Sequence, residues 1–194
     1  MSYTPGEMAD PAKKRATRAD LEALPEHVVG EVIEGVLYTM PRPRPKHTSA
    51  ATVLGGDLNG PFQRGRGGPG GWWILAEPGI ELAALDVAEI VPDLAGWRRE
   101  RLPELPEGSI RLAPDWVCEL LSPSTRAHDL KRKRPLYAKA GVGWMWLVDV
   151  DARFLTASRL HEGHWLEVGT WSDDDVARIE PFEAVELDLS DLWS

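Results

Sequence analysis

The sequence D-W-V-C-E-L-L-S-P-S-T-R-A-H-D-L-K-R-K-R-P-L-Y occupies residues 115–137 and combines the two kinds of element that decide the fold. Its apolar first part predicts a buried strand, the Ser-Pro pair predicts a turn, and the basic second part predicts a helix. Glu119 lies in the middle of the strand, and Asp129 and Lys133 lie one helical turn apart on the helix. A carboxylate among Trp, Val, Cys and Leu is costly to bury unless a cation compensates it. Either a lysine or a bound metal ion could supply that charge.

The chain is long enough for one domain with a sizeable core. It has 194 residues, of which 43% are hydrophobic and 27% are charged, as in ordinary globular proteins. No apolar run reaches the roughly 18–20 residues that span a bilayer, and the N-terminus has no apolar signal segment. The single cysteine, Cys118, rules out an internal disulfide and a cysteine-based zinc cluster. We therefore expect a cytoplasmic protein without a membrane partner.

The net charge of −9 is unevenly distributed along the chain. Residues 144–194 have 3 basic and 12 acidic side chains, whereas the two signs balance in the part before them. The overall sign argues against broad, sequence-independent DNA binding. The first three quarters of the chain could still present a basic face to a polyanion.

The order of the predicted elements indicates a mixed α/β fold. A helix is expected at residues 17–25, two strands at 28–40, a helix at 47–62, strands at 72–97, a loop at 98–114, a strand at 143–150 and a β-hairpin at 154–171. Within this series, residues 72–82 are expected to form one hairpin-like unit. Residues 1–16 are polar and we expect a flexible arm there, with residues 17–194 forming a single domain. The fold class is thus a mixed central sheet flanked by helices, with extra N- and C-terminal β-hairpins.

Two carboxylates fall in neighbouring predicted strands, those of Asp93 and Glu119. Strand alternation allows them to converge if the two strands pair in register. Two carboxylates a few Å apart repel each other, so they share a proton or hold a cation. Mg²⁺ prefers carboxylate oxygens and retains several waters, and it can orient a water and lower the pKa of that water.

Lys133 permits two interpretations. Its ammonium could position or deprotonate a metal-bound water, or neutralise charge on a phosphate. The simpler interpretation is a surface ion pair with Asp129, four residues earlier on the same helix.

Other polar residues have simple structural explanations. Glu31 fits a sheet edge, His47 fits a helix cap or the surface, and Cys118 fits the core. The histidines lack the H-E-x-x-H spacing of zinc enzymes. The basic residues at 98–101 and 131–134 could contact phosphates, which would contribute affinity but little specificity.

Several motifs in order give the chain a resemblance to a known family. The motifs are P-D at 92–93, W-V-C-E-L-L-S-P-S-T at 116–125, D-x-x-x-K at 129–133, Y-A-x-A-G-V-x-x-x-W-x-V-D at 137–149, and E-V-I-E-G at 31–35 followed by His47. Together they resemble the Uma family of putative restriction endonucleases, a domain of unknown function in the PD-(D/E)XK nuclease superfamily. The resemblance covers residues 24–150. It implies a restriction-endonuclease-like core for residues 17–194.

The resemblance also implies roles for residues of this chain. Asp93 and Glu119 would match the two acids of the motif, both as ligands of Mg²⁺, with Mn²⁺ as an alternative. The general pattern has a lysine two residues after the second acid, where this chain has Leu121. In this family a helix lysine is thought to replace it, which here is Lys133.

A third acidic group is implied less specifically. Glu31 would match the acid of the first motif, as a third ligand or a water-positioning group. Glu77 is the second candidate.

The implied function is a Mg²⁺-dependent endonuclease that hydrolyses phosphodiester bonds of DNA with metal-activated water, acting as a homodimer. A binding or assembly module that retains the nuclease fold without cleaving is the alternative, favoured by Leu121 and the acidic C-terminal quarter. The third possible function is a dimerisation scaffold whose surface tryptophans form the contact.

Overall fold

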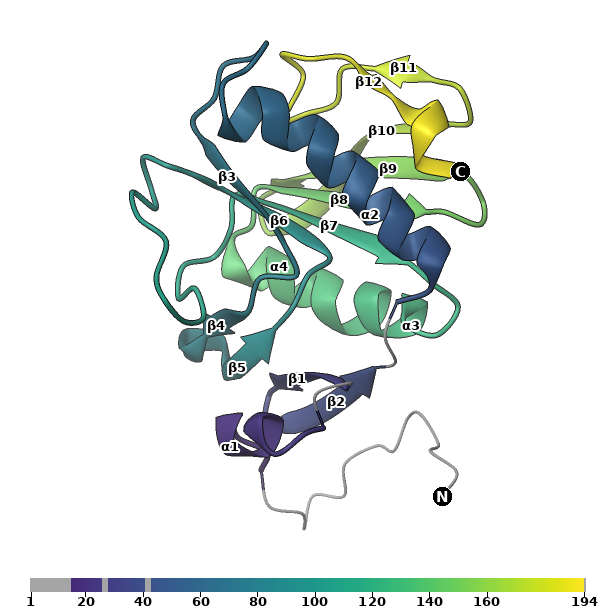
Figure 1. The fold of residues 1–194 in the computed structure, drawn as a ribbon. Coiled ribbons are helices and arrows are strands. Elements are labelled where there is room, and N and C mark those ends of the chain that lie inside the picture. The colour runs from purple at the N-terminus through teal and green to yellow at the C-terminus, as the bar shows by residue number, and fades with distance from the viewer. Residues whose placement is uncertain (1–14, 26–27, 41–42, 194) are drawn as a thin grey trace.

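The computed structural model describes residues 15–25, 28–40 and 43–193, and its centre is a six-stranded sheet with the order β10-β9-β8-β7-β6-β3 (Figure 1). The strands are β3 (Trp72–Ala76), β6 (Leu94–Arg98), β7 (Trp116–Leu121), β8 (Trp144–Asp149), β9 (Phe154–His161) and β10 (His164–Ser172). β7 runs parallel to β8 and antiparallel to β6, and the other neighbours in this sheet are antiparallel. The expected mixed central sheet is therefore confirmed.

β7 is buried at every position because both faces of the sheet are covered. Its even-numbered residues pack into the core that contains α2 (Pro45–Leu58), and Val117 packs into the core that contains α4 (Arg134–Ala140). Alternation therefore directs Glu119 to the α4 side. Cys118 is fully buried on the opposite side and burial raises its pKa well above the usual value, so it is a core residue as expected.

A second sheet of four strands lies on the α4 side, with the order β2-β1-β5-β4. Its strands are β1 (Val29–Ile33), β2 (Val36–Met40), β4 (Ile80–Leu82) and β5 (Val87–Ile90). β1 and β2 form the expected N-terminal hairpin around Glu34 and Gly35, whose φ angles of 53° and 75° suit a tight two-residue turn.

The prediction that residues 72–82 form one hairpin is wrong. β3 pairs with β6 in the large sheet, whereas β4 pairs with β5 in the small one. The Pro78-Gly79 dipeptide between them cannot continue a ladder, so the chain changes sheets there. Pro92 separates β5 from β6 in the same way.

The helices begin and end close to the expected residues. α1 (Arg18–Glu22) starts with a capping box between Thr17 and Asp20. α2 begins at Pro45, two residues before the expected start, and continues into a π-helical turn, η1 (Asn59–Gln63).

The third helical stretch runs without interruption over residues 126–140 and is called here the 126–140 helix. It comprises α3 (Arg126–His128), the π-helical turn η3 (Asp129–Lys133) and α4, and it ends at Gly141 with a φ of 77°. π-helical turns are frequent at functional sites, and this one contains the Asp129–Lys133 pair.

The C-terminal part of the chain adds a hairpin and then packs on the α2 side of the central sheet. β9 and β10 pair around Glu162 and Gly163 as expected and extend the central sheet at its edge. The chain continues through β11 (Val176–Ala177), β12 (Leu187–Asp188) and the 3-10 helix η4 (Leu189–Trp193), which packs beside α2.

Within this segment, Phe182 is fully buried among four aromatic rings. Its neighbours are Phe62, Trp72, Trp116 and Trp146, with ring centroids 4.7–5.6 Å away. The C-terminal segment is therefore part of the core on the α2 side.

The expected arm, residues 1–16, falls outside the described residues except for its last two. Ala16 donates a backbone hydrogen bond to the carbonyl of Gly35, and Arg15 pairs with Asp86.

None of the helices in the described ranges is both long enough and apolar enough to cross a membrane.

Phe182→Ala is expected to destabilise the protein by about 3–5 kcal/mol, because it leaves a cavity among the four aromatic rings. Urea unfolding measures this change. Val176→Ala, at a position that is 58% exposed, is the control and should change stability by less than about 0.5 kcal/mol. Equal effects of the two substitutions would contradict a structural role for the C-terminal segment.

Candidate active site

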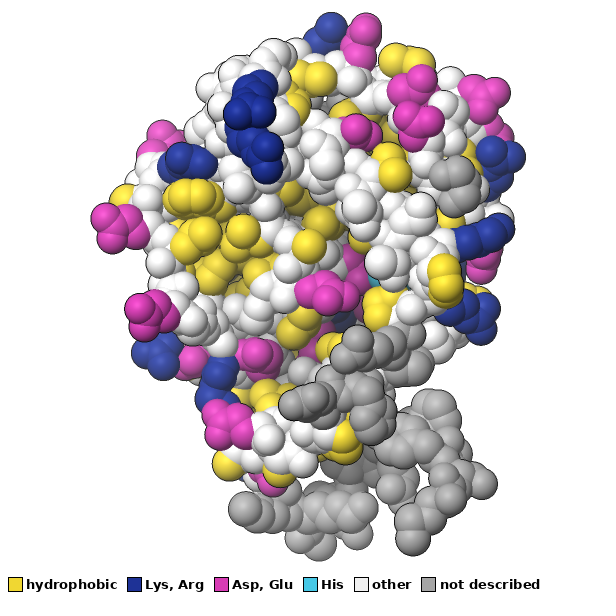
Figure 2. Space-filling model, viewed as in Figure 1, with side chains coloured by type: hydrophobic (Ala, Val, Ile, Leu, Met, Phe, Trp, Pro, Cys, Tyr) yellow, Lys and Arg dark blue, Asp and Glu magenta, His cyan; other side chains and the backbone are white. Residues whose placement is uncertain are grey.

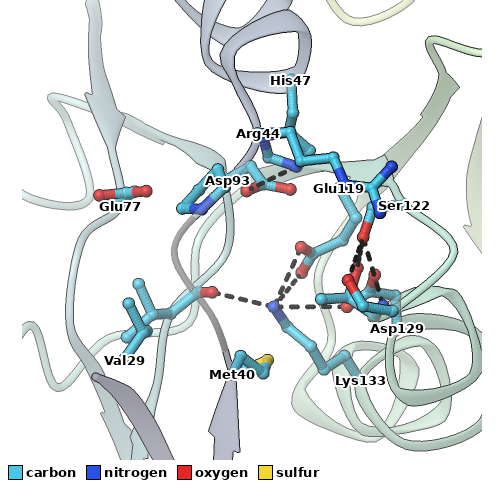
Figure 3. A pocket seen from close by; sticks show the side chains of 14 residues that line it. Val29, Met40, Arg44, His47, Glu77, Asp93, Glu119, Ser122, Asp129 and Lys133 are labelled. Atoms are coloured by element: carbon cyan, nitrogen blue, oxygen red, sulfur yellow. Dashed lines mark hydrogen bonds and ion pairs between the residues drawn. The ribbon is translucent and has the colours of Figure 1, made fainter. Parts of the chain in front are cut away.

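A cavity of about 290 Å³ lies where the two sheets, the start of α2 and the 126–140 helix meet. In Figure 2 acidic side chains gather around this recess, and Figure 3 shows the residues that line it. Its lining residues come from distant parts of the sequence: Val29, Met40, Pro43, Arg44, His47, Glu77, Val91, Asp93, Glu119, Ser122, Ser124, Thr125, Asp129 and Lys133. The cavity therefore brings together three of the acids expected from the sequence, Glu77, Asp93 and Glu119, and the expected lysine.

Lys133 is buried at the centre of this arrangement and is 2% exposed. Its Nζ lies 2.9 and 3.0 Å from the two carboxylate oxygens of Glu119, and it donates to the carbonyl of Val91 at 2.9 Å. Glu31 Oε1 lies 3.3 Å away and Asp129 Oδ1 lies 3.9 Å away. Burial alone would lower the pKa of Lys133, but Glu119, Glu31 and Asp129 outweigh it and raise that pKa. The ammonium is therefore held in its charged form.

The interpretation of Lys133 and Asp129 as a surface pair is wrong. Both residues are buried, and Lys133 lies closer to Glu119 than to Asp129. A π-helical turn gives this part of the helix a different side-chain spacing from that of a regular helix, and the Lys133 side chain points to Glu119 on β7 rather than to solvent.

Glu31 is fully buried behind Lys133, and the expectation that it lies at a sheet edge is wrong. β1 pairs with both β2 and β5, so it is not an edge strand of its sheet, and the Glu31 side chain is buried. Glu31 Oε1 accepts a hydrogen bond from the amide of Val91 at 2.8 Å, and Oε2 lies 2.6 Å from His128 Nε2. Burial raises the pKa of Glu31, but Lys133, His128 and the Val91 amide together hold it below its usual value. Glu31 does not line the cavity.

Glu119 is held by Tyr137 as well as by Lys133. The Tyr137 hydroxyl donates to Glu119 Oε1 at 2.6 Å. Burial raises the pKa of Glu119 well above its usual value, Lys133 opposes this, and Asp129 and Asp93 raise it further. The local repulsion among these acids favours either a proton or a further cation at Glu119.

Asp93 lies one residue before β6 and is fixed against β7. Its Oδ2 accepts from the amide of Leu120 at 2.7 Å, and its Oδ1 lies 3.4 Å from His47 Nε2. The same His47 nitrogen lies 2.9 Å from the carbonyl of Leu120. Because a carbonyl only accepts, His47 Nε2 must carry the proton that points to Leu120 and Asp93.

His47 is therefore neither a helix cap nor a surface residue, in contrast to the expectation. Its side chain is 13% exposed, lies in the first turn of α2 and faces the cavity. Burial lowers its pKa, and the hydrogen bond and charge of Asp93 raise it above the usual value.

Glu77 follows β3 and lies on the opposite side of the cavity from Lys133 (Figure 3). Its backbone amide donates to the carbonyl of Asp93 at 3.0 Å, which fixes the two residues beside each other. Of the two candidates for a third acidic group, Glu77 lines the cavity and Glu31 does not.

The possible metal ligands in the cavity are carboxylate oxygens. Within the described ranges, no three or more His, Cys, Asp and Glu side chains converge as a metal-binding group. Mg²⁺, however, is often bound by one or two carboxylates and several waters, so such a group is not required. Asp93 and Glu119 face one cavity, repel each other electrostatically and have only oxygen ligands to offer. These residues fit a hard divalent cation held by two carboxylates.

Sequence reasoning missed two residues that hold the site, Tyr137 and His128. Tyr137 lies one helical turn after Lys133, so helical spacing could have placed it on the same face. His128 contacts Glu31 across the interface between the helix and β1, and no local pattern indicates that contact.

The three arginines at 98–101 are engaged within the protein. Their contacts are Arg98 over Trp72 at 4.5 Å, Arg99 over Trp73 at 3.9 Å and Arg101 to Asp115 at 2.7 Å. Their expected role as free phosphate contacts is therefore weakened. In the 131–134 stretch, Lys133 is buried, whereas Lys131 and Arg132 are exposed.

The fold and the site together define the class of the protein. A mixed sheet with one parallel pair at its centre, with one acid directly before a strand and a second on the adjacent strand beside a helix lysine, is a restriction-endonuclease-like core. A solved structure from Anabaena variabilis ATCC 29413, titled a putative nuclease belonging to DUF820, has this fold with a TM-score of 0.70. It is 23% identical, and the match covers 91% of this chain and 97% of that one.

The model of the Uma2 family, described as "Putative restriction endonuclease", matches residues 18–190. The chain belongs to the Uma2 family. This confirms the resemblance and the fold class expected from the sequence. A comparison with curated proteins found no match.

Lys133→Met is expected to destabilise the protein by about 3–5 kcal/mol, because it leaves Glu119 and Glu31 buried without their cation. Lys131→Met is the matched control, since Lys131 is exposed on the same helix and should change stability by less than about 0.5 kcal/mol. The deficit of Lys133→Met should shrink in acid, because protonated carboxyl groups need no counter-charge. Chemical unfolding at neutral and acidic pH measures both effects, and a deficit that grew in acid would contradict the assignment.

Proposed function

We propose that this protein is a Mg²⁺-dependent endonuclease that hydrolyses phosphodiester bonds of DNA. The observation that carries the proposal is that Asp93, directly before β6, and Glu119, on β7, line one cavity with a buried lysine beside Glu119. Membership in a family described as restriction endonucleases supports the same reaction class.

Asp93 and Glu119 are the proposed metal ligands. When bound there, a divalent cation would orient a water, lower its pKa and stabilise charge on a phosphoryl oxygen. The protein's own contribution is the fixed orientation of the two carboxylates. Asp93 is held by the Leu120 amide and Glu119 by Tyr137, so neither has to be ordered during the reaction.

Lys133 has the role of a fixed positive charge in this proposal. Its raised pKa and its full set of oxygen neighbours argue against a role as general base, which would require a neutral amine. An ammonium beside Glu119 instead lowers the negative charge of the cavity floor and favours an approaching phosphate.

Asp93→Asn and Glu119→Gln are expected to lower the rate of Mg²⁺-dependent DNA cleavage by about 100-fold or more, because charge stabilisation by a metal is worth several kcal/mol. Cleavage of supercoiled and linear DNA by purified proteins measures the loss. Glu104→Gln, at an exposed loop position, is the control and should cleave at the wild-type rate. Wild-type activity in both site variants would contradict the proposal. Metal binding by a wild type that never cleaves would favour the non-cleaving module.

Removing the charge of Glu77 and removing that of Glu31 are expected to change different properties of the protein, namely Mg²⁺ affinity and stability. Glu77→Gln should weaken Mg²⁺ binding by about tenfold or more with little change in the metal-free melting temperature, because Glu77 lines the cavity. Glu31→Gln should lower the metal-free melting temperature, because it weakens the pairing of buried Lys133. Thermal unfolding at increasing Mg²⁺ separates the two quantities. The reverse pattern would make Glu31 the third acidic group of the site.

A further inference from the structure

The cavity has an excess of negative charge, which opposes the approach of a phosphodiester. The acidic side chains that line it are Glu77, Asp93, Glu119 and Asp129, and the cationic ones are Arg44 and Lys133. Carboxylates repel an anionic substrate unless positive groups face it. Substrate binding therefore depends on which positive or donor group is free to receive a phosphate oxygen.

Lys133 is not free to do so. An ammonium has three protons, and its Nζ already has oxygens of Glu119, Val91 and Glu31 within 3.3 Å. Its 2% exposure leaves little of it open to the cavity. Lys133 thus neutralises the floor of the cavity without being available to a ligand.

The hydroxyl groups at the other side of the cavity are hydrogen-bonded to one another. Ser122 Oγ lies 3.0 Å from both Thr125 Oγ1 and Ser124 Oγ. These hydroxyls carry no net charge, so they do not offset the acidic side chains of the cavity.

Arg44 is the remaining Lys or Arg side chain in the lining, and the Nε2 proton of His47 is already directed to Leu120 and Asp93. Arg44 directly precedes α2 at the cavity and is exposed, and no described acidic residue pairs with it. Figure 3 shows its side chain extended along the cavity on the side of His47 and Ser122. A guanidinium offers a planar pair of donors that matches two oxygens of one phosphate.

We infer that Arg44 binds the non-bridging oxygens of the substrate phosphate at this cavity. The inference rests on the proposed nuclease function and adds to it a substrate-binding residue that no sequence motif singled out. Arg44 supplies the positive charge that Lys133, enclosed by Glu119 and Glu31, cannot offer.

The test compares Arg44→Gln and Arg44→Lys with Arg66→Gln in the full chain. Arg66 is an exposed arginine on the loop beyond the far end of α2, outside the cavity lining. Arg66→Gln therefore removes one positive charge, as Arg44→Gln does, without changing the cavity. Steady-state cleavage of a DNA duplex in Mg²⁺ gives KM and kcat. Fluorescence anisotropy of the same duplex, with Glu119→Gln added to every protein so that the duplex stays intact, gives the affinity.

Arg44→Gln is expected to raise KM and weaken DNA binding about tenfold, because one charge-assisted contact is lost, with a smaller change in kcat. The dependence of log affinity on log salt should decrease by about one. The KM and the DNA affinity of Arg44→Lys should lie between those of the wild type and Arg44→Gln. Arg66→Gln should raise KM much less than Arg44→Gln does. Stabilisation by Mg²⁺ should stay equal or increase in Arg44→Gln, since a positive charge near the carboxylates is removed.

Two results would overturn the inference while the proposed function stands. One is an active wild type in which Arg44→Gln and Arg66→Gln have the same KM and affinity. The other is an Arg44→Gln protein whose Mg²⁺ stabilisation is lost, which would indicate damage to the acidic site instead. A wild type that neither binds nor cleaves the duplex would overturn the proposed function and the inference together.

Discussion

The buried ammonium of Lys133 connects the three layers on which the site depends. The Lys133 side chain extends from the 126–140 helix. Its ammonium contacts Glu119 on the central sheet and Glu31 on the small sheet, and it donates to the carbonyl of Val91 between β5 and β6. Each contact replaces hydration that the charge lost on burial. The ammonium therefore adds a polar contact to all three layers at the place where their shared hydrophobic cluster ends in the cavity. Stability and site geometry are coupled in this protein because both depend on the same three partners.

The carboxylates around Lys133 divide into two groups with different surroundings. Glu31 is closed in by His128, the Val91 amide and Lys133, and its pKa lies below the usual value. Glu119 faces the cavity and other acids, and its pKa lies well above the usual value. The ammonium thus lies between Glu31, which is outside the cavity lining, and Glu119, which is part of it. A cation that engages Glu119 would leave Lys133 with Glu31 as its partner, so the lysine need not move or lose its proton.

Local patterns predicted the strand, the turn and the helix around Glu119, because alternation and helical spacing are properties of short segments. Alternation allowed Asp93 and Glu119 to converge only if their strands paired in register, and the structure supplies that register by pairing Leu94 with Cys118 across β6 and β7. The separation of β3 and β4 into different sheets was not predictable, because hydrophobic alternation does not state which strand is the partner. The burial of Glu31 follows from that same topology, which pairs β1 with β5.

The position of the lysine also affects how the site can assemble. In the general nuclease motif the lysine lies on the same strand as the second acid, so one element carries both charges. Here β7 has Leu121 at that position, which is buried, and the charge comes from a helix 14 residues after Glu119. Glu119 therefore finds its counter-charge only when the helix has docked on the sheet, and Tyr137 from the next turn then fixes its orientation. An undocked helix would leave Glu119 uncompensated in an apolar strand, which is costly. The acidic strand itself thus favours the docked helix, because docking places Lys133 and Tyr137 against Glu119.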